Sequence, residues 1–397
     1  MKIEKIDRRQ FIKITAGSAL AMMSDAAPAL LAKETEPKTR SHYKVFSRGK
    51  IGNLQIKNRL IKAASATAAT TGGCRFLNGG IEMYRDWSKG GVGLINTGHM
   101  TVTPIPPGAY NHNLTCIYDD RFISQINKIA DAVHEADSDC KIVAQLNHIG
   151  THSRGNPVAA SSISLSGPQR KPRALTTIEV QEIRDSFVAA ARRAREAEFD
   201  GVEIHGAHGY LLNTFLSPYT NKRTDVYGGS LKNRVRIVAE IVDQIKTSVA
   251  PDFTVLIKTN CNDRQGARGI NADNFPYMAQ ELEKTGVDAI EISGAMPART
   301  NIDEPEKQSY FVGYAENLKL SIPVILTGGN KSIDEVEKIC QREKVDFFGF
   351  ARPLIAEPDL PNRWLEMVGG PECECISCNQ CLSYLSTGQN LVTCQVL

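Results

Sequence analysis

Three side chains that can donate hydrogen bonds and transfer protons lie close together in the middle of the chain. His205, His208 and Tyr210 lie at the end of GVEIHG (Gly201–Gly206) or just after it, and this segment is typical of a buried strand. Imidazole N–H groups and phenol hydroxyls donate hydrogen bonds, and both can exchange protons. The alternative for either histidine is a structural role where the strand ends. The spacing predicts a site but does not by itself name a reaction.

The strand before this group is one of eight similar segments. Each is short and mostly apolar and is followed by a longer helix-like stretch, as in parallel strands buried on both faces. Eight such repeats predict an α/β fold, a (β/α)8 TIM barrel. A doubly wound sheet is the alternative, but AASATAATTGG after the first segment lacks a G-x-G-x-x-G turn. The segments cover residues 59–65, 91–98, 141–147, 201–206, 253–260, 288–294, 323–329 and 346–352.

Two helix-like stretches begin with residues that favour a helix start. Thr176 precedes the first, and Ser332 precedes the second, where Glu335 occupies the capping-box position. Hydroxyl side chains commonly accept a backbone N–H of the first turn, and a glutamate three residues later can return the bond. We expect helices to begin at both residues.

The carboxyl ends of barrel strands are where functional groups are expected. Gly328 and Gly329 after the seventh segment let backbone N–H groups approach an anion, and the next helix points its positive end the same way. Arg352 after the eighth segment can bind a phosphate through two nitrogens. These residues predict a phosphate site, and the alternative is a tight turn beside a solvated arginine. The carboxyl ends of the other six segments place further residues at the same rim of the barrel, namely Ser65-Ala66, Thr97-Gly98, Gln145, His148, His205, His208, Lys258 and Ser293-Gly294.

Composition and the N-terminus bear on partners and location. The chain has 397 residues, a net charge of +3 and few aromatic residues, which gives no basis for nucleic-acid binding. Residues 1–32 resemble a twin-arginine signal peptide, with paired arginines before an apolar run too short to span a membrane permanently, and residues 33–42 form a polar linker. We expect export to the periplasm and cleavage, which leave no stable membrane span. A cytoplasmic protein with a basic N-terminus, or an uncleaved anchor, is the alternative.

From Tyr43 to Leu397 the chain resembles the old yellow enzyme family of flavin mononucleotide (FMN) oxidoreductases, in particular the branch with 2,4-dienoyl-CoA reductase and bacterial NADH:flavin oxidoreductases. The most specific match is IHGAHGYLLNTFLSPYTNKRTDVYGGSLKNR, and others are KNRLIKAAS, GGVGLINTG, VAQLNHIG, TGG and FARPLIAEPDLPNRW. The resemblance implies non-covalent FMN in a barrel over residues 43–370, with NAD(P)H as the usual electron donor.

The resemblance also implies a role for each candidate residue. Gln145 would bond the pyrimidine edge of the flavin, and Lys258 would stabilise negative charge beside it. His205 and His208 would donate to a substrate carbonyl oxygen while hydride reaches the conjugated C=C bond, and Tyr210 would supply the proton. The other FMN contacts would come from Ala64, Ser65 and Ala66 along the ring and from Gly328, Gly329, Ala351 and Arg352 around the phosphate.

Among the positions that depart from the family pattern, two bear on the flavin potential. Ala66 stands where many relatives have Thr or Cys, whose side chain tunes the flavin potential. Lys258 replaces the more usual arginine and keeps the charge without the planar fork. The flavin potential therefore does not transfer from the family.

The C-terminal tail, residues 371–397, is rich in cysteine. Cys375, Cys378, Cys381 and Cys394 resemble a cysteine set of the dienoyl-CoA reductase branch that binds a [4Fe–4S] cluster, but one loop is a residue shorter here. A [4Fe–4S] cluster, zinc, disulfides and free thiols all stay open. The cysteines expected to be structural are Cys74, Cys116, Cys140, Cys261 and Cys340.

These observations predict an FMN-dependent oxidoreductase that reduces the C=C bond of small α,β-unsaturated carbonyl compounds. One alternative is an FMN dehydrogenase of the trimethylamine dehydrogenase type, although an amine cation favours an aromatic cage over two histidines. Another is a non-catalytic exported flavin electron carrier, which the intact histidine–tyrosine set opposes. Export would separate the protein from soluble NAD(P)H, so a redox partner would then supply electrons.

Overall fold

The computed structural model describes residues 39–67, 69–70, 74–106, 110, 114–163, 171–295, 302, 305–385 and 391–396. The expected signal peptide (residues 1–32) and most of the expected linker (33–42) lie outside these residues. Arg40, near the end of that linker, is buried and donates to the carbonyl oxygen of Trp364 at 2.9 Å. Ordered packing therefore begins before Tyr43.

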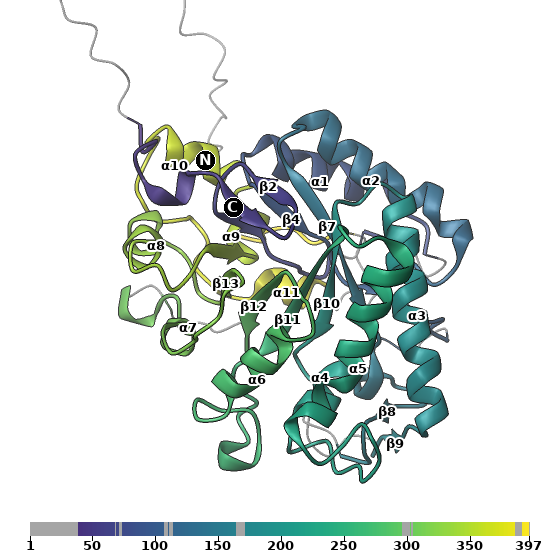
Figure 1. Ribbon diagram of the computed structural model, residues 1–397. Coiled ribbons are helices and arrows are strands. Elements are labelled where there is room, and N and C mark those ends of the chain that lie inside the picture. The colour runs from purple at the N-terminus through teal and green to yellow at the C-terminus, as the bar shows by residue number, and fades with distance from the viewer. Residues whose placement is uncertain are drawn as a thin grey trace, which may run out of the picture. The chain divides into compact units, whose positions relative to one another are not determined.

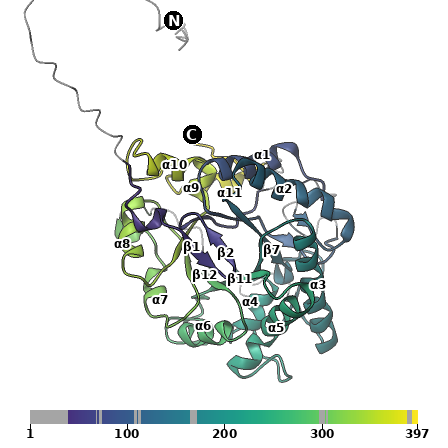
Figure 2. The ribbon, with the colours of Figure 1, turned by 45° about the horizontal axis from the view of Figure 1, so that its top comes forward.

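Eight parallel strands close into a barrel, which confirms the predicted fold class. They neighbour one another in chain order, and the last strand pairs with the first, so the ring has no free edge. Figures 1 and 2 show the helices around the outside of this ring. The strands are β3 (Leu60–Lys62), β4 (Leu94–Asn96), β7 (Lys141–Asn147), β10 (Gly201–Gly206), β11 (Thr254–Asn260), β12 (Ala289–Ser293), β13 (Val324–Thr327) and β14 (Phe347–Phe350).

Helices follow the strands as the repeat predicts. They are α1 (Asn78–Lys89), α2 (Ile123–Ala136), α3 (Thr177–Glu196), α5 (Leu231–Gln244), α6 (Phe275–Glu283), α7 (Val312–Glu316), α8 (Ile333–Cys340) and α10 (Leu360–Leu365). The shorter α4 (Leu211–Leu216), α9 (Arg352–Ala356) and α11 (Gln380–Leu385) add to them. Among the described residues no helix is both long and apolar enough to cross a membrane.

The two predicted helix caps differ in outcome. At α3 the Thr176 hydroxyl accepts the N–H of Glu179 at 3.2 Å, and the Glu179 carboxylate accepts the N–H of Thr176 at 2.8 Å, so a capping box forms. At α8 the Ser332 side chain makes no capping bond. The backbone of Ser332 instead bridges to Glu372 of the tail, so the capping box predicted there is wrong.

Several small elements lie outside the repeat. The strands β5 (Met100–Thr101) and β6 (Thr115–Cys116) extend the sheet beside β7, and β8 (Val158–Ala159) pairs with β9 (Arg173–Ala174). A disulfide joins Cys74 to Cys116, which gives these two cysteines the structural role expected of them. The other three, Cys140, Cys261 and Cys340, are buried.

The barrel interior has an apolar end and a polar end. The hairpin β1 (Gly49–Ile51)–β2 (Leu54–Ile56) lies within the ring in Figure 2, and its Ile51 and Ile56 join an apolar cluster with residues near the amino ends of the strands. Nearer the carboxyl ends, five strands contribute the buried polar side chains Asn96, Gln145, Glu203, Lys258 and Glu291. The hairpin thus closes one end, and the polar layer lies toward the end where chemistry is expected.

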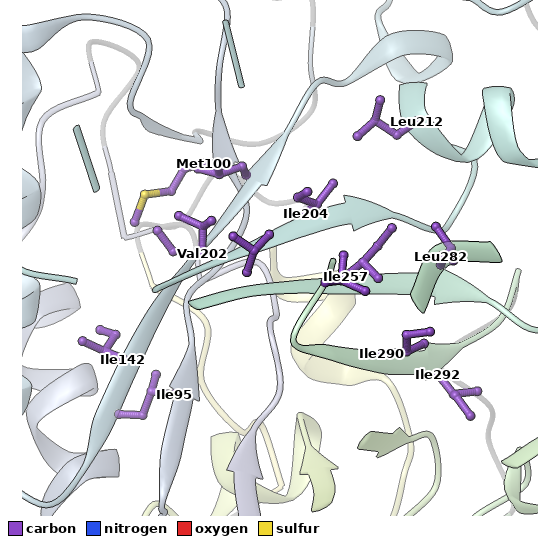
Figure 3. Packing of buried hydrophobic residues seen from close by; sticks show 14 of the residues in the cluster. Ile95, Met100, Ile142, Val202, Ile204, Leu212, Ile257, Leu282, Ile290 and Ile292 are labelled. Atoms are coloured by element: carbon purple, nitrogen blue, oxygen red, sulfur yellow. The ribbon is translucent and has the colours of Figure 1, made fainter. Parts of the chain in front are cut away.

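The main apolar core lies between the strands and the helices. Strand residues such as Ile204 and Ile257 belong to the same buried cluster as Leu282 of α6 (Figure 3). This layer fixes each strand against its covering helix and so fixes the strand ends that carry the site.

Candidate active site

One cavity of about 320 Å³ brings the predicted site residues together. It lies at the carboxyl ends of the barrel strands, and the roles assigned to its residues stay predictions. The predicted residues that line it are Ala64, Ser65, Ala66, Gln145, His205, His208, Tyr210, Lys258, Gly328, Gly329, Ala351 and Arg352.

Some lining residues were missed or misplaced by sequence reasoning. His99, His152 and Lys331 also line the cavity. His99 directly follows the strand end Thr97-Gly98, which was a usable signal, whereas His152 reaches the cavity through a turn that the sequence does not reveal. His148, expected at this rim, lines a different cavity, and its Nδ1 accepts the N–H of Gly150 at 3.1 Å.

A tight turn presents His208 and Tyr210 to the cavity. His208 has a left-handed backbone (φ 60°), and so does Gly209 (φ 78°). The side chain of Asn260 at the end of β11 accepts the N–H of His208 at 3.1 Å, and that of Asn213 in α4 accepts the N–H of Gly209 at 2.8 Å. Two buried amides therefore hold the turn that the sequence places after β10.

Both histidines are neutral hydrogen-bond donors. Nδ1 of His205 accepts the N–H of Ala207 at 3.4 Å, which leaves the imidazole proton on Nε2. Burial, followed by the charge of Lys258, lowers the pKa of His208 to about 3, and burial holds the pKa of His205 well below its usual value. Nε2 of His208 lies 2.8 Å from Oγ of Ser293. Neutral imidazoles suit the binding of a carbonyl oxygen.

Tyr210 holds a phenol proton inside the cavity. Burial, followed by the neighbouring Tyr110, raises the pKa of Tyr210 well above its usual value. The two hydroxyl oxygens lie 2.5 Å apart, and the His152 ring stacks on Tyr210 with 4.3 Å between centroids. Tyr210 is therefore protonated at neutral pH and fixed in place.

A buried ion pair holds Lys258 beside Gln145. Nζ of Lys258 lies 2.8 Å from Oε1 of Glu291, and Nε2 of Gln145 donates to Glu203 at 2.6 Å. Burial would lower the pKa of Lys258, but the two carboxylates outweigh it and raise that pKa. Burial, followed by Glu291, raises the pKa of Glu203. The cavity thus has a permanent cation and a fixed amide side by side, a donor set that fits the pyrimidine edge of a flavin.

The ends of β13 and β14 offer donors for a phosphate where they line the cavity. Gly328 and Gly329 have φ values of 145° and 78°, and a Cβ on Gly329 would lie 2.5 Å from the Tyr310 ring. Lys331 and Arg352 add positive charge. Nη1 of Arg352 also donates to Oδ1 of Asn379 at 2.6 Å, so the tail packs against this part of the cavity. The residues of the cavity fit FMN at both ends.

The cysteines of the tail meet at a second, smaller cavity. Cys375, Cys378, Cys381 and Cys394 line it together with Arg352, which also lines the first cavity. In the part of the chain that the structure describes, no group of three or more His, Cys, Asp or Glu residues is arranged to hold a metal ion. The [4Fe–4S] cluster therefore stays a prediction from the sequence.

Comparison with known proteins places this chain among flavoenzymes. Residues 44–367 match the family model described as NADH:flavin oxidoreductase / NADH oxidase family. A metal reductase of Desulforamulus reducens is 37% identical over 353 residues, which are 86% of this chain and 52% of that protein. An NADPH dehydrogenase of Clostridium acetobutylicum is 31% identical over 322 residues, which are 79% of this chain and 92% of that protein. The chain thus spans about half the length of the first of these relatives and most of the second.

A solved structure shows the same architecture. The structure of 2-naphthoyl-CoA reductase with 2-naphthoyl-CoA superposes with a TM-score of 0.81 at 25% identity and covers 90% of this chain and 57% of that one.

Proposed function

Because the chain belongs to the NADH:flavin oxidoreductase / NADH oxidase family, the family of the old yellow enzyme homologues, we propose that it is an FMN-dependent enzyme that takes electrons from NAD(P)H and reduces the C=C bond of α,β-unsaturated carbonyl compounds. The observation that carries this proposal is the meeting of two neutral imidazoles and a buried phenol at one cavity with Gln145 and Lys258.

Each residue of the cavity has its own role in the proposed reaction. When bound, FMN supplies the hydride. His205 and His208 donate to the substrate carbonyl oxygen, where negative charge builds as the hydride reaches the β-carbon, and one well-placed donor of this kind contributes about 3 kcal/mol. Tyr210 holds the proton that the α-carbon then takes. Lys331 and Arg352 would hold the phosphate of FMN.

The amine dehydrogenase alternative has less support. An amine cation is held best by a cage of aromatic faces. Apart from histidines, Tyr210 and Phe350 are the aromatic side chains among the described residues that line the cavity. Two imidazole donors suit an oxygen that gains negative charge.

Anaerobic turnover tests the proposal. NADH or NADPH should bleach the flavin absorbance of the purified protein, and 2-cyclohexen-1-one should restore it and yield cyclohexanone. Bleaching by trimethylamine with no reoxidation by the enone would favour the amine dehydrogenase. A flavin that responds to none of these compounds would favour an electron carrier.

We also propose export by the twin-arginine route, and in an exported protein a redox partner would deliver the electrons in place of soluble NAD(P)H. The Cys74–Cys116 disulfide supports export because such bonds persist in oxidising compartments. The tail cysteines are the natural entry point if they hold a [4Fe–4S] cluster. The spacing of these cysteines in the sequence is what supports a cluster. About four irons and four sulfides per chain would establish it. Iron-free protein would make the tail a structural cover.

A further inference from the structure

Lys62 is a buried amine that the proposed mechanism does not use. It ends β3, and its side chain is almost fully buried, with 1% of the residue's surface exposed. Nζ donates to the carbonyl oxygen of Ala63 at 2.8 Å and to Oγ of Ser65 at 2.7 Å. The Trp87 ring of α1 lies 4.3 Å from Nζ. Among the described residues, no carboxylate lies within ion-pair distance of Lys62.

A buried ammonium without a carboxylate partner is costly, so its retention points to function. Trp87 compensates part of the cost through its ring face. Its indole N–H donates to the carbonyl oxygen of Leu354 at 2.7 Å, which holds the ring in place. Burial, followed by the charge of Lys258, lowers the pKa of Lys62 to about 7. Both protonation states are therefore accessible near neutral pH.

The partner of Lys62 opens onto the cavity. Ser65 lines the cavity, while the neighbouring Ala66 has no hydrogen-bonding side chain. Because Nζ of charged Lys62 donates to Oγ of Ser65, the hydroxyl hydrogen of Ser65 must point to another acceptor. A neutral amine could instead accept that hydrogen. The charge on Lys62 thus sets the direction in which Ser65 donates.

We propose that Lys62 is a positioning residue that acts on bound FMN through Ser65. Charged Lys62 directs the Ser65 hydroxyl toward the cavity and places a positive charge behind this part of the wall. Both effects favour the extra negative charge of the reduced cofactor, so they raise the flavin potential. The inference rests on the proposed function, because it requires FMN in this cavity.

The groups around Lys62 bear on its titration. In the sheet it pairs with Phe350 of β14 and Ile95 of β4, which do not titrate. Tyr84 of α1 packs on Trp87, and burial raises the pKa of Tyr84 to about 12, so it stays neutral. The charged groups that act on Lys62 are Lys258 of β11 and Glu291 of β12. Those two form an ion pair next to Glu203, whose pKa burial also raises. The pH dependence that belongs to Lys62 is therefore the part that a Lys62 variant removes.

The test is the midpoint potential of the FMN-loaded protein, measured with redox dyes across the pH range. Lys62→Met removes the charge and keeps a side chain of similar length against Trp87. Well below pH 7 the midpoint potential of this variant should be ~30 mV lower than that of the wild type. This difference corresponds to about a tenfold smaller equilibrium constant for two-electron reduction. The difference should shrink as the pH rises through about 7, because the wild type then loses the charge.

Ser65→Ala is the matched variant, since it keeps the ammonium and removes the hydroxyl. It should lower the midpoint potential, with a several-fold smaller equilibrium constant for flavin reduction. If Lys62→Met does not fold, this variant alone tests whether Ser65 acts on the flavin. Potentials equal to the wild type at every pH, in whichever variant holds FMN, would overturn the assignment of Lys62. A wild-type protein that binds no FMN would overturn the proposed function as well, so the two failures are distinguishable.

Discussion

At the residue scale, the proposed activity depends on histidines that carry no charge. His205 and His208 are buried near the cation Lys258, so they stay neutral and act as N–H donors. Tyr210 keeps its proton because burial and Tyr110 raise its pKa. In the proposed mechanism, oxygen binding and proton supply therefore fall to different side chains.

Loss of one imidazole should slow substrate reduction more than cofactor binding. His208→Ala should lower the rate constant of flavin reoxidation by an enone by about 10²–10³-fold, because one donor to the developing oxyanion is lost. Stopped-flow absorbance measures this rate, and flavin content should be unchanged. Ser293→Ala is the control, because it keeps the imidazole and removes its neighbour at 2.8 Å, so its loss should be much smaller. Equal rates in wild type and His208→Ala would remove His208 from the mechanism.

The pH profile separates neutral donors from acid catalysis by histidine. His208 has a pKa of about 3, so it is protonated only below that pH, and Tyr210 loses its proton only well above its usual value. Lys62→Met removes the group with a pKa of about 7, so in this variant the rate of flavin reoxidation should not change with pH. This pH-independent range should run from about pH 5 to about pH 9. A rate that falls as the pH rises through 6 to 7 would indicate a histidine acid instead.

The sequence predicts which strand ends line the cavity better than it predicts which of two nearby side chains faces it. Strand ends predicted Gln145 and Lys258, because parallel strands bring their carboxyl ends together. It could not tell that His152 rather than His148 faces the cavity, since that depends on a turn after β7. Nor did it find Lys62, whose burial depends on the packing of Trp87.

At the element scale, the apolar segments were enough to predict where the strands lie. The capping hydrogen bonds at helix starts could not be predicted in the same way, because they depend on tertiary contacts. Both Thr176 and Ser332 precede helices with a glutamate three residues on. Only Thr176 accepts the N–H of its glutamate. The backbone of Ser332 bridges to the tail, a tertiary contact that the local sequence does not show. A capping box cannot be predicted from the local sequence alone where a residue 40 positions away contacts the same helix start.

The two caps give a matched pair of stability variants. Thr176→Ala removes a capping bond and should lower the free energy of unfolding by about 1 kcal/mol. Ser332→Ala removes a hydroxyl that makes no capping bond, so its effect should be a small fraction of that. Denaturant titration of both variants against the wild type measures the difference. Equal losses would show that the hydroxyl bond at Thr176 contributes nothing.

At the scale of the whole molecule, the location decides which electron donor the enzyme meets. Replacing both Arg8 and Arg9 by lysine should leave the precursor in the cytoplasm, because the twin-arginine route reads the arginine pair. Fractionation of cells that express either form measures the distribution. The cytoplasmic form should also lack the Cys74–Cys116 disulfide, which thiol alkylation and mass spectrometry detect. Wild-type protein found only in the cytoplasm would refute export and leave NAD(P)H as the direct donor.

The cavity at the carboxyl end of the barrel should hold FMN, and the flavin content of the purified protein shows whether it does. The absorption spectrum, followed by release and identification of the cofactor, should show about one FMN per chain. Arg352→Ala should lower that content by removing a phosphate contact. A well-folded wild-type protein that carries no flavin, and takes up none from added FMN, would show that the cavity is not an FMN site.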